Sequence, residues 1–134
     1  MWNGAGLDEL ATNGANWVGG VAPNGGADIA QFDATSSKDC TWDVLNGNFD
    51  KYDVQATYLG TITLTINPGN LFGTFAGGTI DLNGVSTTLS TTTFSGSTVY
   101  MRAGTATGAT IAASVHIMII LYAPALHIYT LMDL

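Results

Sequence analysis

The residues that could act as nucleophiles or bases lie far apart along the chain. Its one cysteine is Cys40, and its two histidines, His116 and His127, belong to an apolar segment near the C-terminus. A cysteine needs a nearby base or positive charge to become a reactive thiolate, and a lone cysteine has no partner for an internal disulfide. We interpret Cys40 as an inert thiol, buried or half-buried.

The carboxylates do not follow the spacing of a catalytic pair. Eight of the ten acidic residues lie between Asp8 and Asp53, whereas the later Thr-rich region holds one acid, Asp81, and one base, Arg102. Polysaccharide cleavage requires clustered carboxyl groups, or a carboxylate with a basic partner, in a groove. Serine-hydrolase and phosphate-loop motifs are also missing from the sequence. We therefore expect no catalytic residue, no cofactor site and no enzymatic activity.

Four early acids, Asp28, Asp33, Asp39 and Asp43, are oxygen ligands of the kind that calcium prefers. Neither an EF-hand loop nor a nonapeptide calcium repeat surrounds them. Their spacing follows turns, so the sequence favours solvated turns and predicts no metal ligand.

The charge distribution excludes nucleic acid as a partner. The formal net charge is −7, and the three basic residues, Lys38, Lys51 and Arg102, are scattered along the chain. Phosphate backbones are neutralised by clustered Lys and Arg. No such cluster exists in this sequence.

The composition predicts one all-β domain spanning residues 1–134. Charged residues make up 10% of the chain, against roughly 25% in an average soluble protein, and Gly, Thr and Asn replace them. Glycine and asparagine tolerate tight turns and threonine favours strands. A length of 134 residues is enough for one core and too short for two ordinary domains.

Residues 1–53 are expected to form an N-terminal cap and the first strands. The run 21–26, Val-Ala-Pro-Asn-Gly-Gly, predicts a turn leading into a strand over residues 28–33. In that strand Ala30 and Phe32 share one face and Ile29 lies on the other. A second strand is predicted over Thr41–Val44.

Residues 54–110 contain an internal repeat of the form aromatic, glycine, threonine, β-branched, any residue, aliphatic. Its threonines, Thr61, Thr79 and Thr98, are spaced by 18 and 19 residues. One step of 18 backwards reaches Asp43 beside Val44, and one step forwards reaches His116 beside Ile117. The sequence thus predicts five rungs at one spacing.

A spacing of 18–19 residues fits one turn of a parallel β-solenoid, in which identical positions stack on one another. Two inward columns and an outward threonine ladder follow from the period of two in a strand. The first column is Ile62, Ile80 and Val99; the second is Leu64, Leu82 and Met101; the corners are Gly60, Gly77 and Gly96; and the ladder is Thr61, Thr79 and Thr98. The alternative is a β-sandwich built from hairpins of similar length.

Residues 111–134 form an apolar segment without glycine. It carries two histidines, a proline at position 124 and no Lys or Arg, whereas a membrane-spanning helix needs about 20 apolar residues and is usually flanked by basic ones. Membrane insertion is the less favoured interpretation. We expect a last rung or a C-terminal cap; a segment foreign to the fold is the remaining alternative.

Three motifs near the N-terminus resemble the opening of autotransporter-type and filamentous-haemagglutinin-like β-helical surface proteins of bacteria. They are Trp2-Asn3-Gly4, the segment 16–24 with its Asn-Trp-x-x-Gly-x-x-Pro pattern, and the Asp-x-Ala-x-Phe strand at 28–32. The repeats that follow are also similar to those of this family, so the likeness covers roughly residues 2–110. The resemblance implies a right-handed parallel β-helix, export to the cell surface, and adhesive or scaffolding use.

We therefore expect a non-enzymatic extracellular structural or adhesive module, with itself (as a homo-oligomer or fibre) or surface glycans as partners. The first alternative is a carbohydrate-binding module that uses Trp2, Trp17 and Trp42, although tryptophans beside turns are more often buried. The second is ice binding, suggested by the alternation of Thr61, Thr63 and Thr65. Exposed aromatics on one face would favour a binder, and buried tryptophans a scaffold.

Overall fold

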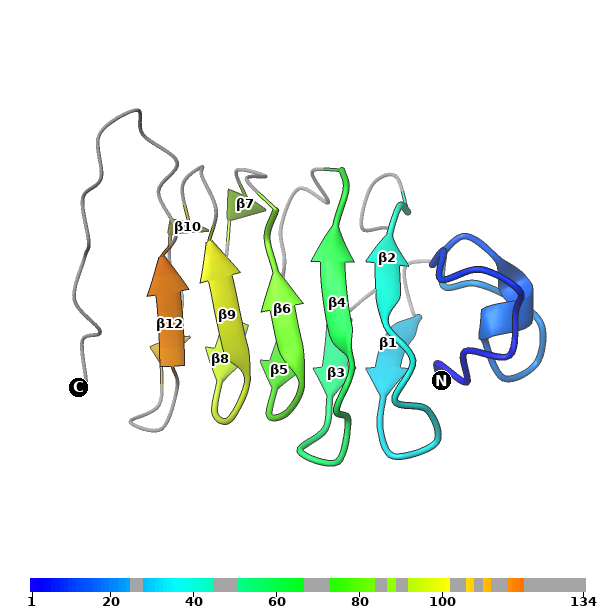
Figure 1. The fold of residues 1–134 in the computed structure, drawn as a ribbon, viewed down its shortest axis with the longest axis horizontal. Helices are drawn as coiled ribbons and strands as arrows, with labels where there is room; N and C mark the ends of the chain where they lie inside the picture. Colours follow the sequence, from blue (N-terminus) through cyan, green and yellow to red (C-terminus); the bar gives the residue numbers. More distant parts are fainter. Residues whose placement is uncertain are drawn as a thin grey trace.

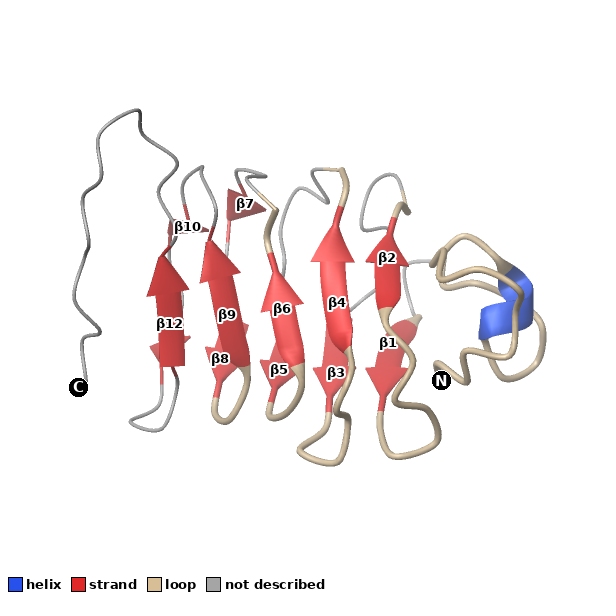
Figure 2. Ribbon diagram, in the orientation of Figure 1, coloured by secondary structure: helices blue, strands red, loops and turns tan. Residues whose placement is uncertain are grey.

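A computed structural model describes residues 1–24, 28–44, 51–66, 73–83, 87–88, 92–101, 106–107, 110–111 and 116–119. In this part of the chain, strands alternate with turns and the only helix is a short 3-10 helix, η1 (Gly14–Asn16) (Figure 2). The strands are β1 (Ile29–Phe32), β2 (Cys40–Trp42), β3 (Lys51–Val54), β4 (Thr61–Leu64), β5 (Gly73–Phe75), β6 (Thr79–Asp81), β7 (Thr87–Thr88), β8 (Thr92–Phe94), β9 (Thr98–Met101), β10 (Ala106–Thr107), β11 (Thr110–Ile111) and β12 (His116–Ile119). The predicted all-β class is confirmed.

Two five-stranded sheets, parallel throughout, form the body of the molecule. The first has the order β1-β3-β5-β8-β11 and the second the order β12-β9-β6-β4-β2, while β10 and β7 form a parallel pair of their own. The chain alternates between the two main sheets and adds one strand to each in turn. The two sheets form two layers, one behind the other in Figure 1. Every pair of described strands is parallel, whereas hairpins would pair consecutive strands antiparallel.

The predicted register of the repeat is confirmed over four strands. Thr61 pairs with Thr79, Thr79 with Thr98, and Thr98 with His116. Across both sheets, paired residues are 17 to 22 positions apart in the sequence. The predicted spacing of 18–19 therefore holds in the repeat and varies around it elsewhere.

The backward step to Asp43 and Val44 is wrong. The residue that pairs with Ile62 is Cys40, which lies 22 positions earlier. Asp39 precedes Cys40 as Thr61 precedes Ile62, so Asp39 and Thr61 occupy equivalent positions in successive turns. The Asp39 carboxylate oxygen accepts a hydrogen bond of 2.7 Å from the Thr61 amide. The connection between β2 and β4 is longer than those in the repeat, so a backward step of 18 from Thr61 stops four residues short of the equivalent position, Asp39. The strand predicted at 41–44 begins one residue and ends two residues earlier than expected, at 40–42.

The first inward column is confirmed. Ile62, Ile80 and Val99 pair directly across β4, β6 and β9, and each is at most 2% exposed. In the second column Leu64 and Leu82 are buried, and the side chain of Met101 lies outside what the structure describes. Stacking like on like removes branched side chains from water between the two sheets, which is the main favourable contribution to the fold.

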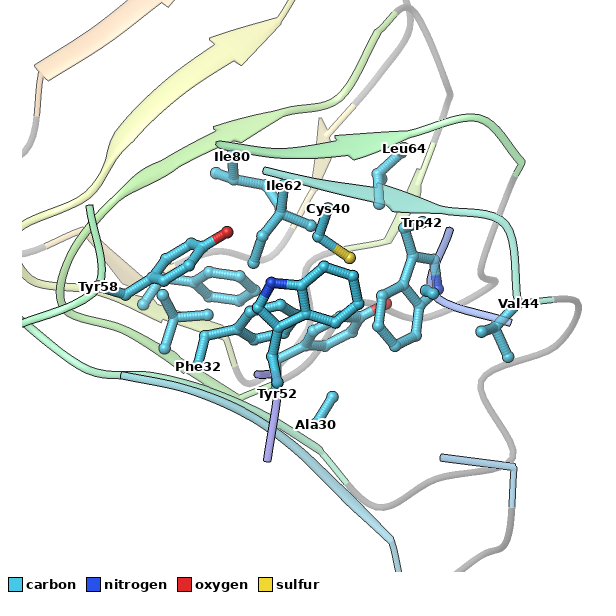
Figure 3. Close-up of a cluster of buried hydrophobic side chains, with 14 of the residues drawn as sticks. Ala30, Phe32, Cys40, Trp42, Val44, Tyr52, Tyr58, Ile62, Leu64 and Ile80 are labelled. Atoms are coloured by element: carbon cyan, nitrogen blue, oxygen red, sulfur yellow. The ribbon is translucent and has the colours of Figure 1, made fainter. Parts of the chain in front are cut away.

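Residues of β1 follow the alternation that the sequence predicts. Ala30 and Phe32 are fully buried, while Ile29 on the opposite face is 46% exposed. Phe32 begins a column of the first sheet that continues in register through Val54, Phe75 and Phe94. This column faces the aliphatic column of the second sheet, as Figure 3 shows for Phe32 on one side and Ile62 and Ile80 on the other.

The corner glycines are required by close stacking of successive turns. A Cβ on Gly77 would overlap the Gln55 carbonyl oxygen, and one on Gly96 would overlap the Ala76 carbonyl oxygen. At Gly60 a Cβ would lie 2.5 Å from the Tyr58 hydroxyl oxygen as well as 2.8 Å from the Ser37 carbonyl oxygen. The corner role predicted for these three glycines agrees with this geometry, and the cause is contact with the previous turn's backbone.

Replacing Ile80 by alanine tests the column. Because Ile80 is buried between Ile62 and Val99, we expect Ile80→Ala to reduce the free energy of unfolding by roughly 2 to 5 kcal/mol. The control is Thr79→Ala, a neighbouring half-buried outward position, which should cost less than about 1 kcal/mol. Urea denaturation followed by circular dichroism measures both, and equal losses would contradict the inward column.

Candidate functional surfaces

Cys40 is buried in the core, as the sequence analysis expected. It is 1% exposed and pairs in register with Ile62. Burial raises the pKa of its thiol well above the ordinary value, and the negative charges of Asp43, Glu9 and Asp39 raise it further. A thiol in this environment stays protonated and has no route to substrate.

The four acids considered as calcium ligands serve separate turns. The carboxylate of Asp28 accepts from the Asn24 amide, that of Asp33 from the Thr35 amide, and that of Asp39 from the Thr61 amide. Asp43 accepts from both the amide and the hydroxyl of Thr12, at 2.9 and 2.6 Å. Within the described residues, no three His, Cys, Asp or Glu side chains come together as a metal site would require.

Among the remaining titratable residues of the sequence analysis, the structure describes the side chain of Asp81 and the backbone of His116. Asp81 is 5% exposed, and its carboxylate accepts a hydrogen bond of 2.9 Å from the Asn83 amide, across a turn in which Asn83 has a positive φ of 47°. His116 lies on β12 and pairs with Thr98. Arg102 and His127 lie outside the described residues.

All three tryptophans are buried. Trp2 and Trp42 are 0% exposed and Trp17 is 2% exposed. Their rings continue the core toward the N-terminus: Trp17 lies edge-on to Trp2 with centroids 5.2 Å apart and edge-on to Trp42 at 6.4 Å. The interpretation of the tryptophans as cap and core residues is confirmed, and their faces are closed to a sugar ring.

An aromatic chain links these tryptophans to the repeat. Trp42 contacts Tyr52 with ring centroids 4.8 Å apart, and Tyr52 contacts Phe75 at 5.6 Å. Phe75 then stacks on Phe94 at 5.2 Å. Burial raises the pKa of the Tyr52 hydroxyl well above its ordinary range, so this row of rings acts as packing and supplies no acid or base.

Residues 1–24, which we call the cap, close the N-terminal end of both sheets. In the second sheet, Leu10 forms a parallel bridge with Thr41 of β2: the Thr41 amide donates to the Glu9 carbonyl oxygen at 2.7 Å, and the Ala11 amide donates to the Thr41 carbonyl oxygen at 2.9 Å. In the first sheet, the Trp2 amide donates to the Gln31 carbonyl oxygen of β1 at 2.8 Å. Figure 1 shows the cap beside β1 and β2.

Asn16 organises the cap from within. It is 0% exposed, and its side-chain oxygen accepts from the Gly6 amide at 2.8 Å. Its side-chain nitrogen lies within hydrogen-bond distance of the Asp8 carboxylate and the Asp8 and Leu10 carbonyl oxygens. One buried amide thus holds the loop 6–10 in place. The sequence analysis included Asn16 only as the first residue of the motif at 16–24 and did not predict its role in the cap, because most of its partners are backbone groups that leave no residue pattern.

Lys38 joins the cap to the body. Its ammonium group donates to the carbonyl oxygens of Gly6 and Asp8 at 2.8 and 2.5 Å. Its own carbonyl oxygen accepts from the Trp2 indole at 3.1 Å and from the Tyr58 hydroxyl at 2.9 Å. A single residue between β1 and β2 therefore touches the cap, the core and the next turn.

The outward face of the second sheet carries the predicted threonine ladder. Thr61, Thr79 and Thr98 are half-buried, because each shields its neighbour in the column. The adjacent outward column is not made of threonines throughout, because Thr63 pairs with Asp81 and Asp81 pairs with Tyr100. Thr65 lies beyond the end of β4, and its hydroxyl donates to the Trp42 carbonyl oxygen at 3.0 Å. The alternation that suggested ice binding is therefore limited to one column.

The first sheet carries a second threonine column that the sequence analysis missed. Thr74 pairs with Thr93, and Thr93 pairs with Thr110. These threonines occupy a different position of the repeat from Thr61, Thr79 and Thr98. Their spacing of 19 and 17 residues is the sequence signal that could have predicted this column. Asp53 and Gln31 extend the column toward the cap.

Comparison with protein-family models, with curated proteins and with solved structures finds no match for this chain. Within the described residues, no helix has the length and hydropathy of a membrane span.

We expect acid to destabilise the cap by protonating the Asp8 carboxylate. Hydrogen bonds from Asn13, Leu10 and Asn16 and the charge of Lys38 lower the pKa of the Asp8 carboxyl in the folded protein. A lowered folded pKa means that Asp8 stabilises the fold above its unfolded pKa of about 3.9, and that this contribution is lost as the pH falls through the folded value. We expect Asp8→Asn to flatten the loss of stability below about pH 4.

Chemical denaturation over a pH series measures this effect. The control is Asp33→Asn, because the pKa of Asp33 is lowered mainly by hydrogen bonds from Thr35, which lies outside the cap, and less by the charge of the N-terminus. Asp33→Asn should remove the part of the pH dependence of the unfolding free energy that Asp33 contributes, and leave the part due to Asp8. Identical pH profiles for the intact protein and Asp8→Asn would disprove the role of Asp8.

Proposed function

We propose that this chain is a right-handed parallel β-helix and a non-enzymatic structural or adhesive module of the bacterial cell surface. The observation that carries the proposal is the in-register stacking of parallel strands in two facing sheets, with the tryptophans inside the stack. Such a body is a rigid rod with polar outer columns, which is the form of a spacer or scaffold.

The alternation of the chain between the sheets supports the β-helix. Each return to the same sheet takes 17 to 22 residues and places the new strand beside the preceding one in that sheet. Crossover connections between parallel strands of one sheet are right-handed in about 98% of cases. The right hand is therefore the expected one, in agreement with the resemblance of the N-terminal motifs and repeats to bacterial β-helical surface proteins.

The fate of the polar groups supports a structural role. The acids Asp28, Asp33, Asp39 and Asp43 accept hydrogen bonds from backbone amides, and the one thiol is buried and protonated. Residues that would carry chemistry in an enzyme are used here to hold the backbone. The small share of charged residues and the threonine columns give the outer faces a polar character with few charges, which suits an extracellular surface.

An adhesive role draws support from the cap. Of the seven large apolar side chains that are exposed in the described part, six belong to residues 1–29. Exposed apolar residues gathered at one end of the described part suit contact with another surface. Leu7, Val18 and Val21 are the most exposed of these six.

The two alternatives receive no comparable support. A carbohydrate-binding module would present aromatic faces, and none of the large apolar side chains exposed in the described part is aromatic. Ice binding would need a wide regular array of hydroxyls, and the column beside the ladder is interrupted by Asp81. We therefore propose neither as the function of this chain.

Surface location can be tested on cells that produce the protein. Antibodies raised against the purified chain should bind intact cells, and protease added outside should abolish that binding. A cytoplasmic protein serves as the control and should stay undetected until the cells are lysed. Detection of the chain only after lysis would contradict the proposed location.

Tryptophan fluorescence separates a scaffold from a glycan binder. Because Trp2, Trp17 and Trp42 are buried, we expect blue-shifted emission, weak quenching by iodide, and no change on adding surface polysaccharides. Denatured protein is the control and should show red-shifted emission and strong quenching. A saturable emission shift on adding a polysaccharide would contradict burial of the rings and support the carbohydrate alternative.

A further inference from the structure

An amine and a carboxamide lie side by side where Lys38 meets the cap. The Lys38 ammonium group donates to the Asp8 carbonyl oxygen at 2.5 Å, and the Asn16 side-chain nitrogen donates to the same oxygen at 3.2 Å. Both side chains also meet Gly6, whose carbonyl oxygen accepts from Lys38 and whose amide donates to Asn16. The fold thus makes neighbours of two reactive groups that are 22 positions apart in the sequence.

The groups around the Asn16 carboxamide are those that an acyl transfer requires. The Gly6 amide donates to Oδ1 at 2.8 Å, the oxygen on which negative charge develops when a nucleophile adds to Cγ. The Asp8 carboxylate accepts from Nδ2 at 3.1 Å, the nitrogen that leaves in such a reaction. Asn16 is 0% exposed, so bulk water is kept from the carboxamide while the Lys38 amine lies beside it.

We propose that Lys38 and Asn16 join through an amide bond between their side chains, an isopeptide bond, with Asp8 carrying the proton. The Asp8 carboxylate takes a proton from the Lys38 ammonium group, and the free amine adds to Cγ of Asn16. Asp8 returns this proton to Nδ2, the bond between Cγ and Nδ2 breaks, and ammonia leaves. The ammonia takes up the second proton of the amine, so the products are a secondary amide and an ammonium ion, and no oxidant or cofactor takes part.

This bond ties the cap covalently to the body of the molecule. Asn16 belongs to the cap and Lys38 lies between β1 and β2, where its carbonyl oxygen accepts from the Trp2 indole and the Tyr58 hydroxyl. These contacts hold both reacting parts in place before the bond forms. The reaction takes place once in each chain and turns over no substrate, so the chain remains non-enzymatic. The inference goes beyond the proposed function and does not depend on the location of the protein.

Mass spectrometry of the full chain tests the bond directly. After incubation at neutral pH, the folded chain should have a mass lower than that of its sequence by one ammonia molecule. Trypsin does not cleave after an acylated lysine, so residues 1–51 of the linked chain should remain in one peptide. A chain that is folded by circular dichroism, has the full mass of its sequence and is cut after Lys38 would overturn the proposal.

Lys38→Arg separates this bond from other ways of losing ammonia. Arginine keeps the positive charge and the hydrogen-bond donors, but its guanidinium group stays protonated and does not act as a nucleophile. The variant should therefore have its full mass and be cut after position 38, whereas the matched control Lys51→Arg should still lose ammonia. If Lys38→Arg loses the same ammonia, as it would from a succinimide at the Asn13-Gly14 pair, the assignment to Lys38 is overturned.

Asp8→Asn tests the proton carrier. An asparagine at position 8 can still accept from Asn16 through its side-chain oxygen, yet it cannot take the proton of the Lys38 ammonium group. We expect the linked form to appear roughly 100-fold more slowly, or not at all. The matched control is Glu9→Gln, which removes the same charge from the next residue and should leave the rate of linkage unchanged. Equal rates of ammonia loss in the two variants would overturn the role of Asp8.

Discussion

The structure depends on backbone pairing between parallel strands that lie about one repeat apart in the sequence. Each such pair sets like residues beside each other, so that Ile80 lies between Ile62 and Val99 while Thr79 lies between Thr61 and Thr98. A shift by one residue would exchange the buried and outward sets of a whole strand. The burial of the aliphatic column therefore maintains the register, and the register in turn keeps the corner glycines against the preceding turn.

This constraint explains why the ends need special treatment. Inside the stack every strand has neighbours on both sides, whereas β1 and β2 would each present an edge at the N-terminal end. The cap solves this with a few backbone hydrogen bonds, a buried asparagine and two tryptophans that extend the core.

The absence of a catalytic cluster in the described part has the same origin. In a stack of short strands, inward positions must be apolar and outward positions are shared with neighbouring rungs, so acids are concentrated in turns. There they accept backbone amides, as Asp39 and Asp33 do. The surface columns of threonine provide solvation and strand propensity. Among the described residues, most of the exposed large apolar side chains belong to residues 1–29.

The repeat was predictable from the sequence alone. Thr61, Thr79, Thr98 and His116, with their inward neighbours, were assigned to the correct register because local alternation and a constant spacing both mark the same positions. The strand at 28–33 and the burial of Cys40 and the tryptophans were predictable for a similar reason, since residue type reports burial. The partner of Ile62 and the closure of the sheet edges were decided only by the tertiary structure. Cys40 lies 22 positions back because connection lengths vary between turns, and the cap docks through carbonyl and amide groups that every residue possesses.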